Sequence, residues 1–229
     1  MAAGSGTRMG SELPKQFIEL GGKAILQRTI EVFLKAVPGI KVVTVLPEAH
    51  IEYWRSYCLD HNFICPQIIV KGGITRFHSV KNALSRIPDG AIVAVHDGVR
   101  PLVSSRFVAD MFKQAESLSA LIPVIPCVDT MKVLQRKGDE LVTVPGQTVD
   151  RSVLFGAQTP QIFHSEVIKA AYEQAYDTAF TDDASVVDKY GKNLSYLIGE
   201  RFNIKITTKD DIVLANAILS LSPCDSSSH

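Results

Sequence analysis

Residues suited to binding a phosphate chain stand at the start of the sequence. They are Ala2, Ala3, Gly4, Ser5, Gly6, Thr7, Arg8, Met9 and Gly10, with the run Leu13-Pro14-Lys15-Gln16 after them. Small residues allow backbone N–H groups to approach a ligand closely, and successive N–H groups form a concavity that binds anions. Arg8 and Lys15 add a planar cationic fork and a compact point charge, both of which suit phosphate. The pattern predicts a loop that binds a triphosphate.

Two other phosphate-binding motifs fit this loop poorly. The P-loop needs a Lys directly after its last glycine, whereas Lys15 lies five residues past Gly10. The dinucleotide motif G-x-G-x-x-G is met only loosely, because Gly10 follows Gly6 one position too late. The pair Gly4 and Gly6 alone would suit an ordinary turn. The whole string AAGSGTRMG…PKQ is more specific, and it resembles the loop of sugar-nucleotide-type nucleotidyltransferases. In these enzymes a buried apolar strand precedes the loop, whereas this sequence begins on the loop. Without that strand the sheet would lose a central member.

The composition predicts an ordinary globular protein. A chain of 229 residues with 46% hydrophobic and 21% charged residues is expected to form one large domain. Acidic and basic residues balance at 24 each, which argues against nucleic acid or a membrane as a partner. The cysteines (Cys58, Cys65, Cys127 and Cys224) lack CxxC spacing, so we expect free thiols in a reducing compartment. No apolar run reaches membrane-spanning length and no signal peptide is apparent, so we expect a cytoplasmic protein.

The segments that must position the candidate residues alternate between strands and helices. Helices are expected at 25–37, 48–62, 77–86, 105–118, 165–176 and from 181, with a last helix capped by Thr208 and Asp211. Strands are expected at 42–46, 68–70, 91–95, 121–125, 194–198 and 204–207, and residues 158–163 should return to the core. This alternation predicts an α/β fold with three layers, Rossmann-like, around a mainly parallel sheet. Ligands of such sheets bind beyond the carboxyl ends of the strands. The N-terminal loop, Gly72-Gly73 and residues 97–100 should therefore converge there.

Residues 129–155 break this alternation. Two loosely alternating runs, 131–135 and 140–144, flank the turn 136–139 and predict a protruding β-hairpin. An isolated hairpin is barely stable in water, so it should pack on something, and a second subunit is a good candidate. We expect a single domain over 1–221 with a β-arm at about 129–155. Residues 222–229 should form a loose polar tail.

Motifs spread over nearly the whole chain extend the resemblance. They are AAGSGTRMG, LPKQ, HDGVRP, DTMK, TVDRSVL…QTPQ, TDDAS and NIKITT, in this order. Together they resemble the 2-C-methyl-D-erythritol 4-phosphate cytidylyltransferases of the non-mevalonate isoprenoid pathway. Ribitol-5-phosphate cytidylyltransferases share most of these motifs. The resemblance implies that CTP and a polyol phosphate react to give a CDP-alcohol and pyrophosphate.

The resemblance also implies a role for each matching residue. The catalytic residues would be Arg8, Lys15, Arg151 and Lys205. The nucleotide would contact Ala2, Ala3, Gly4, Ser5, Gly6, Thr7, Gly73, Ser79, Asp97 and Gly98. The acceptor would contact Asp97, Arg100, Thr130, Arg151, Thr159, Lys205 and Thr207. In the family the arm crosses to the partner of a homodimer, where its arginine reaches the acceptor's phosphate. Ile74 departs from the family pattern, which often has an acidic residue there, so base contacts at this point would come from the backbone or be absent.

The implied chemistry needs cations rather than a general base. Attack on the α-phosphorus of CTP places charge on the equatorial oxygens of a five-coordinate centre, and fixed cations stabilise that charge. The attacking phosphate monoester is already largely an anion at neutral pH, because its second pKa is about 6. The sequence contains no HExxH motif, Cys/His cluster or Ser-x-x-Lys nucleophile. We expect Mg²⁺ or another divalent cation, held mainly by the CTP phosphates, and no protein metal site.

Simpler interpretations stand beside these roles. Lys205 lies between two isoleucines, so it would point away from the core if they face inward, and solvent exposure alone would explain that. Asp97 could cap a turn, and Arg151 could bond within its own hairpin. No motif separates methylerythritol phosphate from ribitol phosphate as the acceptor. An NAD(P)-dependent oxidoreductase is the alternative of another class. The glycine spacing argues against it, and so does the lack of an acidic residue about twenty positions on at the end of a second strand. A catalytically inactive binding module would share the fold, but the presence of Arg8, Lys15 and Lys205 argues against it.

Overall fold

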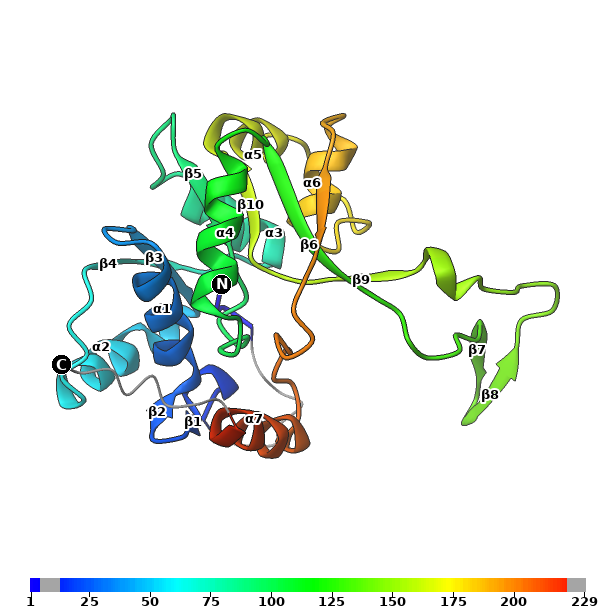
Figure 1. Ribbon diagram of the computed structural model, residues 1–229, viewed down its shortest axis with the longest axis horizontal. Coiled ribbons are helices and arrows are strands. Elements are labelled where there is room, and N and C mark those ends of the chain that lie inside the picture. Colours follow the sequence, from blue (N-terminus) through cyan, green and yellow to red (C-terminus); the bar gives the residue numbers. More distant parts are fainter. Residues whose placement is uncertain (5–12, 222–229) are drawn as a thin grey trace.

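The structure is a computed structural model that describes residues 1–4 and 13–221. The predictions made for residues 5–12 and 222–229 lie outside the described residues. The described part of the chain is an α/β fold with two β-sheets that contain parallel strands, flanking helices and a separate β-hairpin (Figure 1).

The larger sheet has the strand order β11-β6-β10-β5. Its strands are β5 (Ile92–Val95), β6 (Ala120–Pro126), β10 (Gln161–His164) and β11 (Ser195–Ile198), and β9 (Phe155–Ala157) also pairs with β6. Strand β11 runs parallel to β6, whereas β10 lies between β5 and β6 and is antiparallel to both. Strands β5, β6 and β11 therefore share one direction. The mainly parallel sheet was predicted, but the reversed direction of β10 was not.

A second, smaller sheet pairs β3 (Val42–Leu46) with β4 (Gln67–Lys71) in parallel. A short antiparallel pair, β1 (Glu19–Leu20) and β2 (Lys23–Ala24), precedes it along the chain. In the described residues these strands form no ladder with the larger sheet.

Met1 and Ala2 connect the two sheets through backbone hydrogen bonds. The N–H of Ala2 donates to the Val45 carbonyl of β3 at 2.9 Å, and the Met1 carbonyl accepts from Gly98 N–H at 2.8 Å. The Met1 amino group donates to the carbonyl oxygen of His96, just past β5, at 2.6 Å. The first residues are thereby fixed at the carboxyl ends of β3 and β5.

Seven helices of the described chain cover the sheets. They are α1 (Ile25–Ala36), α2 (Ile51–Asp60), α3 (Arg76–Leu84), α4 (Ser105–Ala115), α5 (Ser165–Ala171), α6 (Asp183–Lys189) and α7 (Lys209–Leu221). The predicted apolar face of α1 is buried at Leu26, Ile30 and Phe33. Side chains of Thr75, Ser104 and Asp182 cap α3, α4 and α6. None of these helices is both long and apolar enough to cross a membrane.

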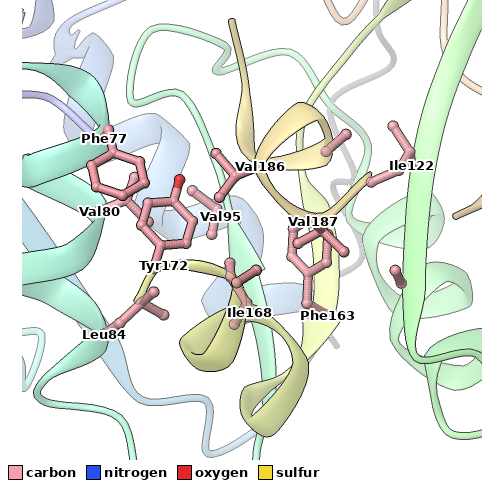
Figure 2. Packing of buried hydrophobic residues seen from close by; sticks show 13 residues of the cluster. Phe77, Val80, Leu84, Val95, Ile122, Phe163, Ile168, Tyr172, Val186 and Val187 are labelled. Carbon is pink, nitrogen blue, oxygen red and sulfur yellow. The ribbon is translucent and has the colours of Figure 1, made fainter. Parts of the chain in front are cut away.

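Alternating side chains of β6 show that the larger sheet is the middle of three layers. Ala120 and Ile122 pack with α3, α5 and α6, and Figure 2 shows this cluster around Tyr172 and Phe163. Leu121, between them, packs on the other face with Met111 of α4. This two-sided burial is what successive residues of a strand covered by helices on both faces should show.

The hairpin of β7 (Leu134–Lys137) and β8 (Glu140–Thr143) extends away from both sheets (Figure 1). Gly138 occupies the turn with φ 64°, a left-handed conformation that glycine adopts without steric cost. Every residue of the hairpin's two strands is exposed except Val142, which is half-buried. The predicted hairpin is present, and the described chain gives its strands no apolar surface to pack on.

The prediction of a strand at 204–207 was wrong. This segment is extended but forms no ladder, although the Ile206 N–H donates to the Val99 carbonyl at 2.9 Å. The N–H groups of Thr207 and Thr208 donate to the Asp211 carboxylate instead of to a neighbouring strand. The Asp211 N–H donates in turn to the Thr208 hydroxyl, so these two residues cap α7 as predicted. The helix predicted at 165–176 is also shorter, because α5 ends at Ala171.

Candidate active site

A pocket of about 440 Å³ lies where the predicted segments converge. Its lining includes these predicted site residues: Ala2, Ala3, Gly4, Lys15, Gly73, Ser79, Asp97 and Lys205. A larger groove of about 750 Å³ lies beside β6, β11 and α6, but its lining is mostly apolar and contains none of the predicted site residues. We therefore place the candidate active site in the smaller pocket.

Small residues allow three backbone segments to approach one another at this pocket. A Cβ atom on Gly72 would lie 2.6 Å from the Cβ of Ala3, and one on Gly98 would lie 3.0 Å from the Cβ of Ala2. Such distances are shorter than van der Waals contact, so larger residues would push the N-terminal residues away. The predicted contacts of Ser5, Gly6, Thr7 and Arg8 lie outside the described residues.

Lys15 is the first residue of a short 3-10 helix, Lys15–Phe17, whose other side chains are buried. The Gln16 amide donates to the Ala2 carbonyl at 2.9 Å, and the Phe17 ring stacks on Trp54 with their centroids 5.9 Å apart. These contacts fix the backbone directly after Lys15, which lines the pocket.

The turn after β4 forms another part of the pocket lining. The Gly73 N–H donates to Ser79 Oγ at 2.9 Å, and the Ser79 hydroxyl donates to the Thr75 carbonyl at 2.9 Å. A Cβ atom on Gly73 would lie 2.8 Å from the carbonyl carbon of His78, so only glycine fits there. Ile74 is almost fully exposed and supplies no polar side-chain group.

Asp97 is the only carboxylate among the described residues that line the pocket, and it forms ion pairs with two basic side chains. Its Oδ2 lies 3.0 Å from Lys205 Nζ and 3.3 Å from Arg100 Nε. Burial alone would raise the pKa of Asp97, but Lys205, Arg76 and Arg100 together lower it well below its usual range. Asp97 is therefore an anion that orients Lys205 across the pocket, as the proposed role of that lysine requires.

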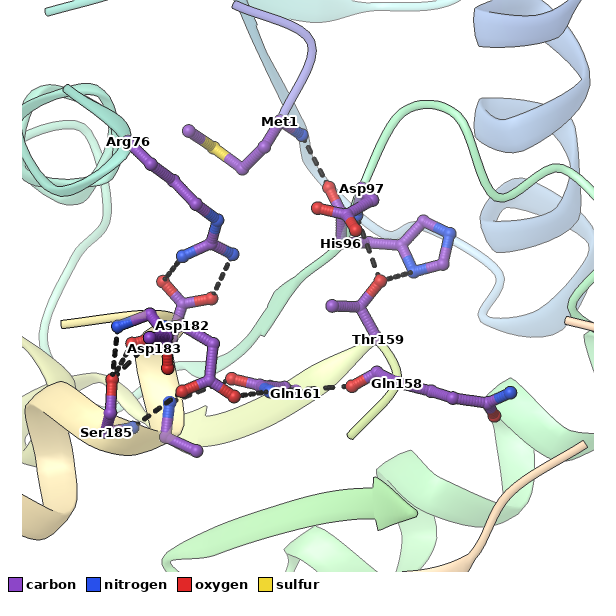
Figure 3. A network of polar contacts seen from close by, with 12 residues as sticks. Met1, Arg76, His96, Asp97, Gln158, Thr159, Gln161, Asp182, Asp183 and Ser185 are labelled. Atoms are coloured by element: carbon purple, nitrogen blue, oxygen red, sulfur yellow. Dashed lines mark hydrogen bonds and ion pairs between the residues drawn. The ribbon is translucent and has the colours of Figure 1, made fainter. Parts of the chain in front are cut away.

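His96 orients the end of β5 behind Asp97 (Figure 3). Its Nε2 lies 3.1 Å from the Arg100 carbonyl, so this nitrogen carries the proton, and Nδ1 accepts from the Thr159 hydroxyl at 3.0 Å. The Thr159 oxygen in turn accepts from the Asp97 N–H at 3.1 Å. Burial lowers the pKa of His96 to about 3, so the ring is neutral. His96 is thus a packed residue that supports the site.

The segment that carries Lys205 is held by two buried amides. Gln158 donates to the Glu200 carbonyl at 2.8 Å, and Asn203 donates to the Thr159 carbonyl at 2.8 Å. Arg100 Nη1 donates to the carbonyl of Asn203 at 2.7 Å. As predicted, Lys205 points outward while Ile206 is fully buried.

Five predicted acceptor residues do not line this pocket: Arg100, Thr130, Arg151, Thr159 and Thr207. Arg151 is exposed at the base of the hairpin and donates to the Val128 carbonyl at 3.1 Å, and Thr130 is exposed nearby. The Thr207 hydroxyl donates to Asp211 at 2.9 Å. Within one chain, Lys15 and Lys205 line the same pocket, whereas Arg151 does not line it.

Sequence reasoning missed Arg76, which lines the same pocket as the first residue of α3. The Thr75 cap marks the start of that helix and could have placed Arg76 beside the glycine pair. Its partner, Asp183, lies 107 residues away and could not be identified from the pattern.

The pocket has the donors expected around a divalent cation that phosphates hold. No group of three or more His, Cys, Asp or Glu side chains that could bind a metal occurs among the described residues. Among the described lining residues, Asp97 alone offers a carboxylate to the pocket. Mg²⁺ commonly binds through one or two carboxylates together with substrate phosphates and water, so this donor set fits it when the nucleotide supplies the phosphates.

Comparison with known proteins gives consistent matches. A family model described as 2-C-methyl-D-erythritol 4-phosphate cytidylyltransferase matches residues 1–221. The enzyme of that name from Bacteroides fragilis is 44% identical over 219 residues, which cover 96% of this chain and 97% of the relative. The one from Geobacter metallireducens is 37% identical and covers 95% of this chain and 94% of the relative.

Solved structures agree with this match. The Francisella tularensis 2-C-methyl-D-erythritol 4-phosphate cytidylyltransferase has a TM-score of 0.75 at 31% identity, over 94% of this chain and 95% of that one. The 4-diphosphocytidyl-2C-methyl-D-erythritol synthase of Anaerococcus prevotii has a TM-score of 0.77 at 26% identity, over 96% and 93%. The chain therefore belongs to the 2-C-methyl-D-erythritol 4-phosphate cytidylyltransferase family.

Proposed function

We propose that this protein transfers the cytidylyl group of CTP to 2-C-methyl-D-erythritol 4-phosphate and releases pyrophosphate, a step in the synthesis of isoprenoid precursors. The observation that carries the proposal is the convergence of Lys15 and Lys205, from opposite ends of the chain, on one pocket lined by small residues. The family of the chain supports the identity of both substrates.

The reaction joins two anions, so the protein's main task is to neutralise charge. An oxygen of the acceptor's phosphate attacks the α-phosphorus of CTP, a new P–O bond forms, and the bond to the β-phosphate oxygen breaks. Lys15 and Lys205 stabilise the charge on the α-phosphoryl oxygens, together with Arg8, whose role is implied by its motif. The nucleophile is already ionised, and holding both reactants in line supplies the remaining catalysis.

The nucleotide lies between the N-terminal residues and the turn after β4 in this proposal. Backbone groups of Ala2, Ala3 and Gly4 line its phosphate end, and Gly73 and Ser79 contact the edge of the cytosine. The close packing of Gly72 against Ala3 supports this arrangement, because it holds the two walls of the pocket at a fixed distance. Asp97 and Gly98 contact the ribose.

The acceptor lies beyond Asp97, near Arg100 and Thr159. Asp97 accepts hydrogen bonds from hydroxyl groups of the polyol, and it orients the Lys205 ammonium group between the two substrates. Because Asp97 is buried and anionic, it excludes a second anion from its own position. The acceptor's phosphate must therefore lie toward the cations, and Arg151 and Thr130 from another subunit complete its site.

A divalent cation, Mg²⁺ by preference, would be held mainly by the CTP phosphates, and Asp97 is the carboxylate that the described pocket would offer it. When bound, it withdraws charge from the phosphoryl oxygens and fixes the conformation of the triphosphate. The side chains of this protein do the rest: Lys15 binds phosphate oxygens, and Lys205 bridges the two reactants.

The hairpin β7–β8 acts as an arm between two copies of the chain. Residues 1–221 form one domain, and the segment 129–155 crosses to the partner. The exposure of Leu134, Leu141 and Phe155 supports this role, because an isolated hairpin with apolar side chains in water is barely stable. We place the enzyme in the cytoplasm, where Cys58, Cys65 and Cys127 remain free thiols.

The test is a comparison of two acceptors. Pyrophosphate release is measured with CTP and Mg²⁺ in the presence of either 2-C-methyl-D-erythritol 4-phosphate or ribitol 5-phosphate. We expect a higher kcat/KM for the methylerythritol compound, in agreement with the named relatives. A higher value for ribitol 5-phosphate would assign the chain a different acceptor, and no turnover with either compound would contradict the proposal.

A further inference from the structure

Arg76 is a cation in the nucleotide pocket that no predicted role accounts for. Its guanidinium forms a two-pronged ion pair with Asp183, at 2.8 Å from Nη1 to Oδ1 and 2.5 Å from Nη2 to Oδ2 (Figure 3). The same side chain lines the pocket beside Gly73, Thr75 and Ser79. Arg76 therefore connects the proposed cytosine-binding turn with the first residue of α6.

Asp183 is built to hold this arginine in one orientation. Its residue is fully buried, and the Tyr172 hydroxyl donates to Oδ1 at 2.6 Å. Asp182 beside it caps α6 and accepts from the Gln161 amide at 2.7 Å. A carboxylate buried in this way is stable only when it is paired and hydrogen-bonded. In the TDDAS motif, Asp182 thus caps α6, and Asp183 holds Arg76.

The ion pair leaves part of the guanidinium for a ligand. Arginine has five N–H donors, and Asp183 takes two of them, one on each terminal nitrogen. No other residue in the described ranges 1–4 and 13–221 accepts a hydrogen bond from Arg76. About a third of its side chain, 34%, is exposed, and this exposed part belongs to the pocket lining. Fixed donors without acceptors in a binding pocket suit a ligand that presents acceptor atoms.

We infer that Arg76 is a nucleotide-binding residue that recognises the pyrimidine, with Asp183 as its positioning residue. The cytosine ring presents two adjacent acceptors, O2 and N3, whereas uracil carries a proton on N3. A donor-only side chain beside Gly73 and Ser79 therefore favours CTP over UTP. The inference rests on the proposed function, since it takes the turn at Gly73 to be the cytosine end of the site.

The test compares Arg76→Lys with the wild-type enzyme. Lysine keeps the positive charge opposite Asp183, so the protein should fold, but it cannot pair with the carboxylate and also offer oriented donors. We expect the KM for CTP to rise about tenfold, equivalent to about 1.4 kcal/mol. The KM for the acceptor should change less than about twofold, and the preference for CTP over UTP should fall, because only nucleotide contacts are lost.

Two further variants separate positioning from stability. Asp183→Asn should also raise the KM for CTP, and adding it to Arg76→Lys should have little further effect, because both changes break one contact. Lys81→Gln is the matched control, since it removes an exposed ion pair with Glu173 from the same helix α3 and should leave the KM for CTP unchanged. Thermal unfolding of each variant reports its stability.

An unchanged KM for CTP in Arg76→Lys would overturn this inference while leaving the proposed function intact. Equal rises in the KM values of both substrates would also overturn it, since they would indicate a general loosening of the pocket. A wild-type enzyme that fails to use CTP would instead contradict the proposed function.

Discussion

Single residues decide the charge balance within the pocket. Asp97 pairs with Lys205 and Arg100, so its carboxylate fixes the position of the Lys205 ammonium group at the pocket. Lys15 reaches the same pocket from a different element. The residues therefore require little rearrangement to face an incoming triphosphate, which is how fixed charges stabilise a transition state efficiently.

We predict that Lys15→Ala and Lys205→Ala each lower kcat by about 10²–10³-fold, because each removes stabilisation of about 3–4 kcal/mol from the transition state. Lys15 is partly exposed, so its loss should change thermal unfolding little. Loss of Lys205 also removes a partner of the buried Asp97 carboxylate and should lower the unfolding temperature. Steady-state pyrophosphate release measures the rate. A variant with the wild-type kcat would exclude that lysine from the mechanism.

His96 should make the protein less stable as the pH falls. In the unfolded chain a histidine takes up its proton near pH 6.5, whereas burial lowers the pKa of folded His96 to about 3. Between these values the unfolded state binds one more proton, so the free energy of unfolding falls by up to about 1.4 kcal/mol per pH unit as pH decreases. The stability is fully present above about pH 6.5.

Urea unfolding at pH 7 and pH 5 measures this dependence. Replacing His96 with Gln removes the titrating group, so the variant should lose less stability than the wild type over that interval. The Asp97 carboxylate titrates at lower pH and does not contribute in this interval, because its folded pKa lies below its usual range. Identical pH dependence in the two proteins would show that His96 is not the group responsible.

At the scale of elements, local patterns predicted most helices and strands. The apolar face of α1, the β-branched run of β3 and the cap of α7 depend on residues close together in sequence. The antiparallel direction of β10 could not be predicted in this way, because its partner strands β5 and β6 lie far from it in sequence. The alternating pattern of 204–207 wrongly predicted a strand. The Ile206 N–H donates to the Val99 carbonyl of a loop and the Thr207 N–H to the capping Asp211, so neither bonds to a strand.

The candidate site was predicted mainly through its motifs. Lys205 alone has the pattern of a solvent-exposed strand residue, and only the NIKITT motif assigned it a role. Its pairing with Asp97, and the pairing of Arg76 with Asp183, join segments more than a hundred residues apart. Such contacts depend on the folded arrangement of elements, which periodicity does not encode.

The turn after β4 gives a prediction at this scale. Gly73→Ala should raise the KM for CTP and destabilise the protein by about 1–3 kcal/mol, because the added Cβ overlaps His78 and must shift the turn. Gly156→Ala is the control, since its Cβ would lie 3.7 Å from Ile125, an ordinary contact. Thermal unfolding and CTP kinetics measure both effects. Equal behaviour of the two variants would show that the turn tolerates a side chain.

At the scale of the whole molecule, the pocket of one chain lacks the arginine expected to bind the acceptor's phosphate. Arg151 lies at the base of a hairpin that extends away from the sheets (Figure 1). A symmetric dimer would let each arm reach the partner's pocket, because in such a dimer every contact occurs twice. The proposed dimer thereby accounts for both the exposed hairpin and the incomplete acceptor site.

We predict that mixing inactive Arg151→Ala with inactive Lys205→Ala restores activity. In a mixed dimer one pocket keeps its own Lys205 and receives an intact Arg151, so random exchange should give about a quarter of wild-type activity. Mixing Lys15→Ala with Lys205→Ala is the control, since both lysines belong to one pocket and no exchange can repair it. Pyrophosphate release after subunit exchange measures recovery, and its absence in the first mixture would exclude an arm that acts in trans.

The pocket joins Ala2 to Lys205, and this has a consequence for the protein during its synthesis. The ribosome releases the first wall of the pocket early and the lysine only when translation is nearly complete. Until Lys205 has left the exit tunnel, the nascent chain lacks one of the two lysines that line the described pocket, however much of its core has formed. A polypeptide that ends before residue 205 would therefore lack the lysine proposed to bridge the two substrates.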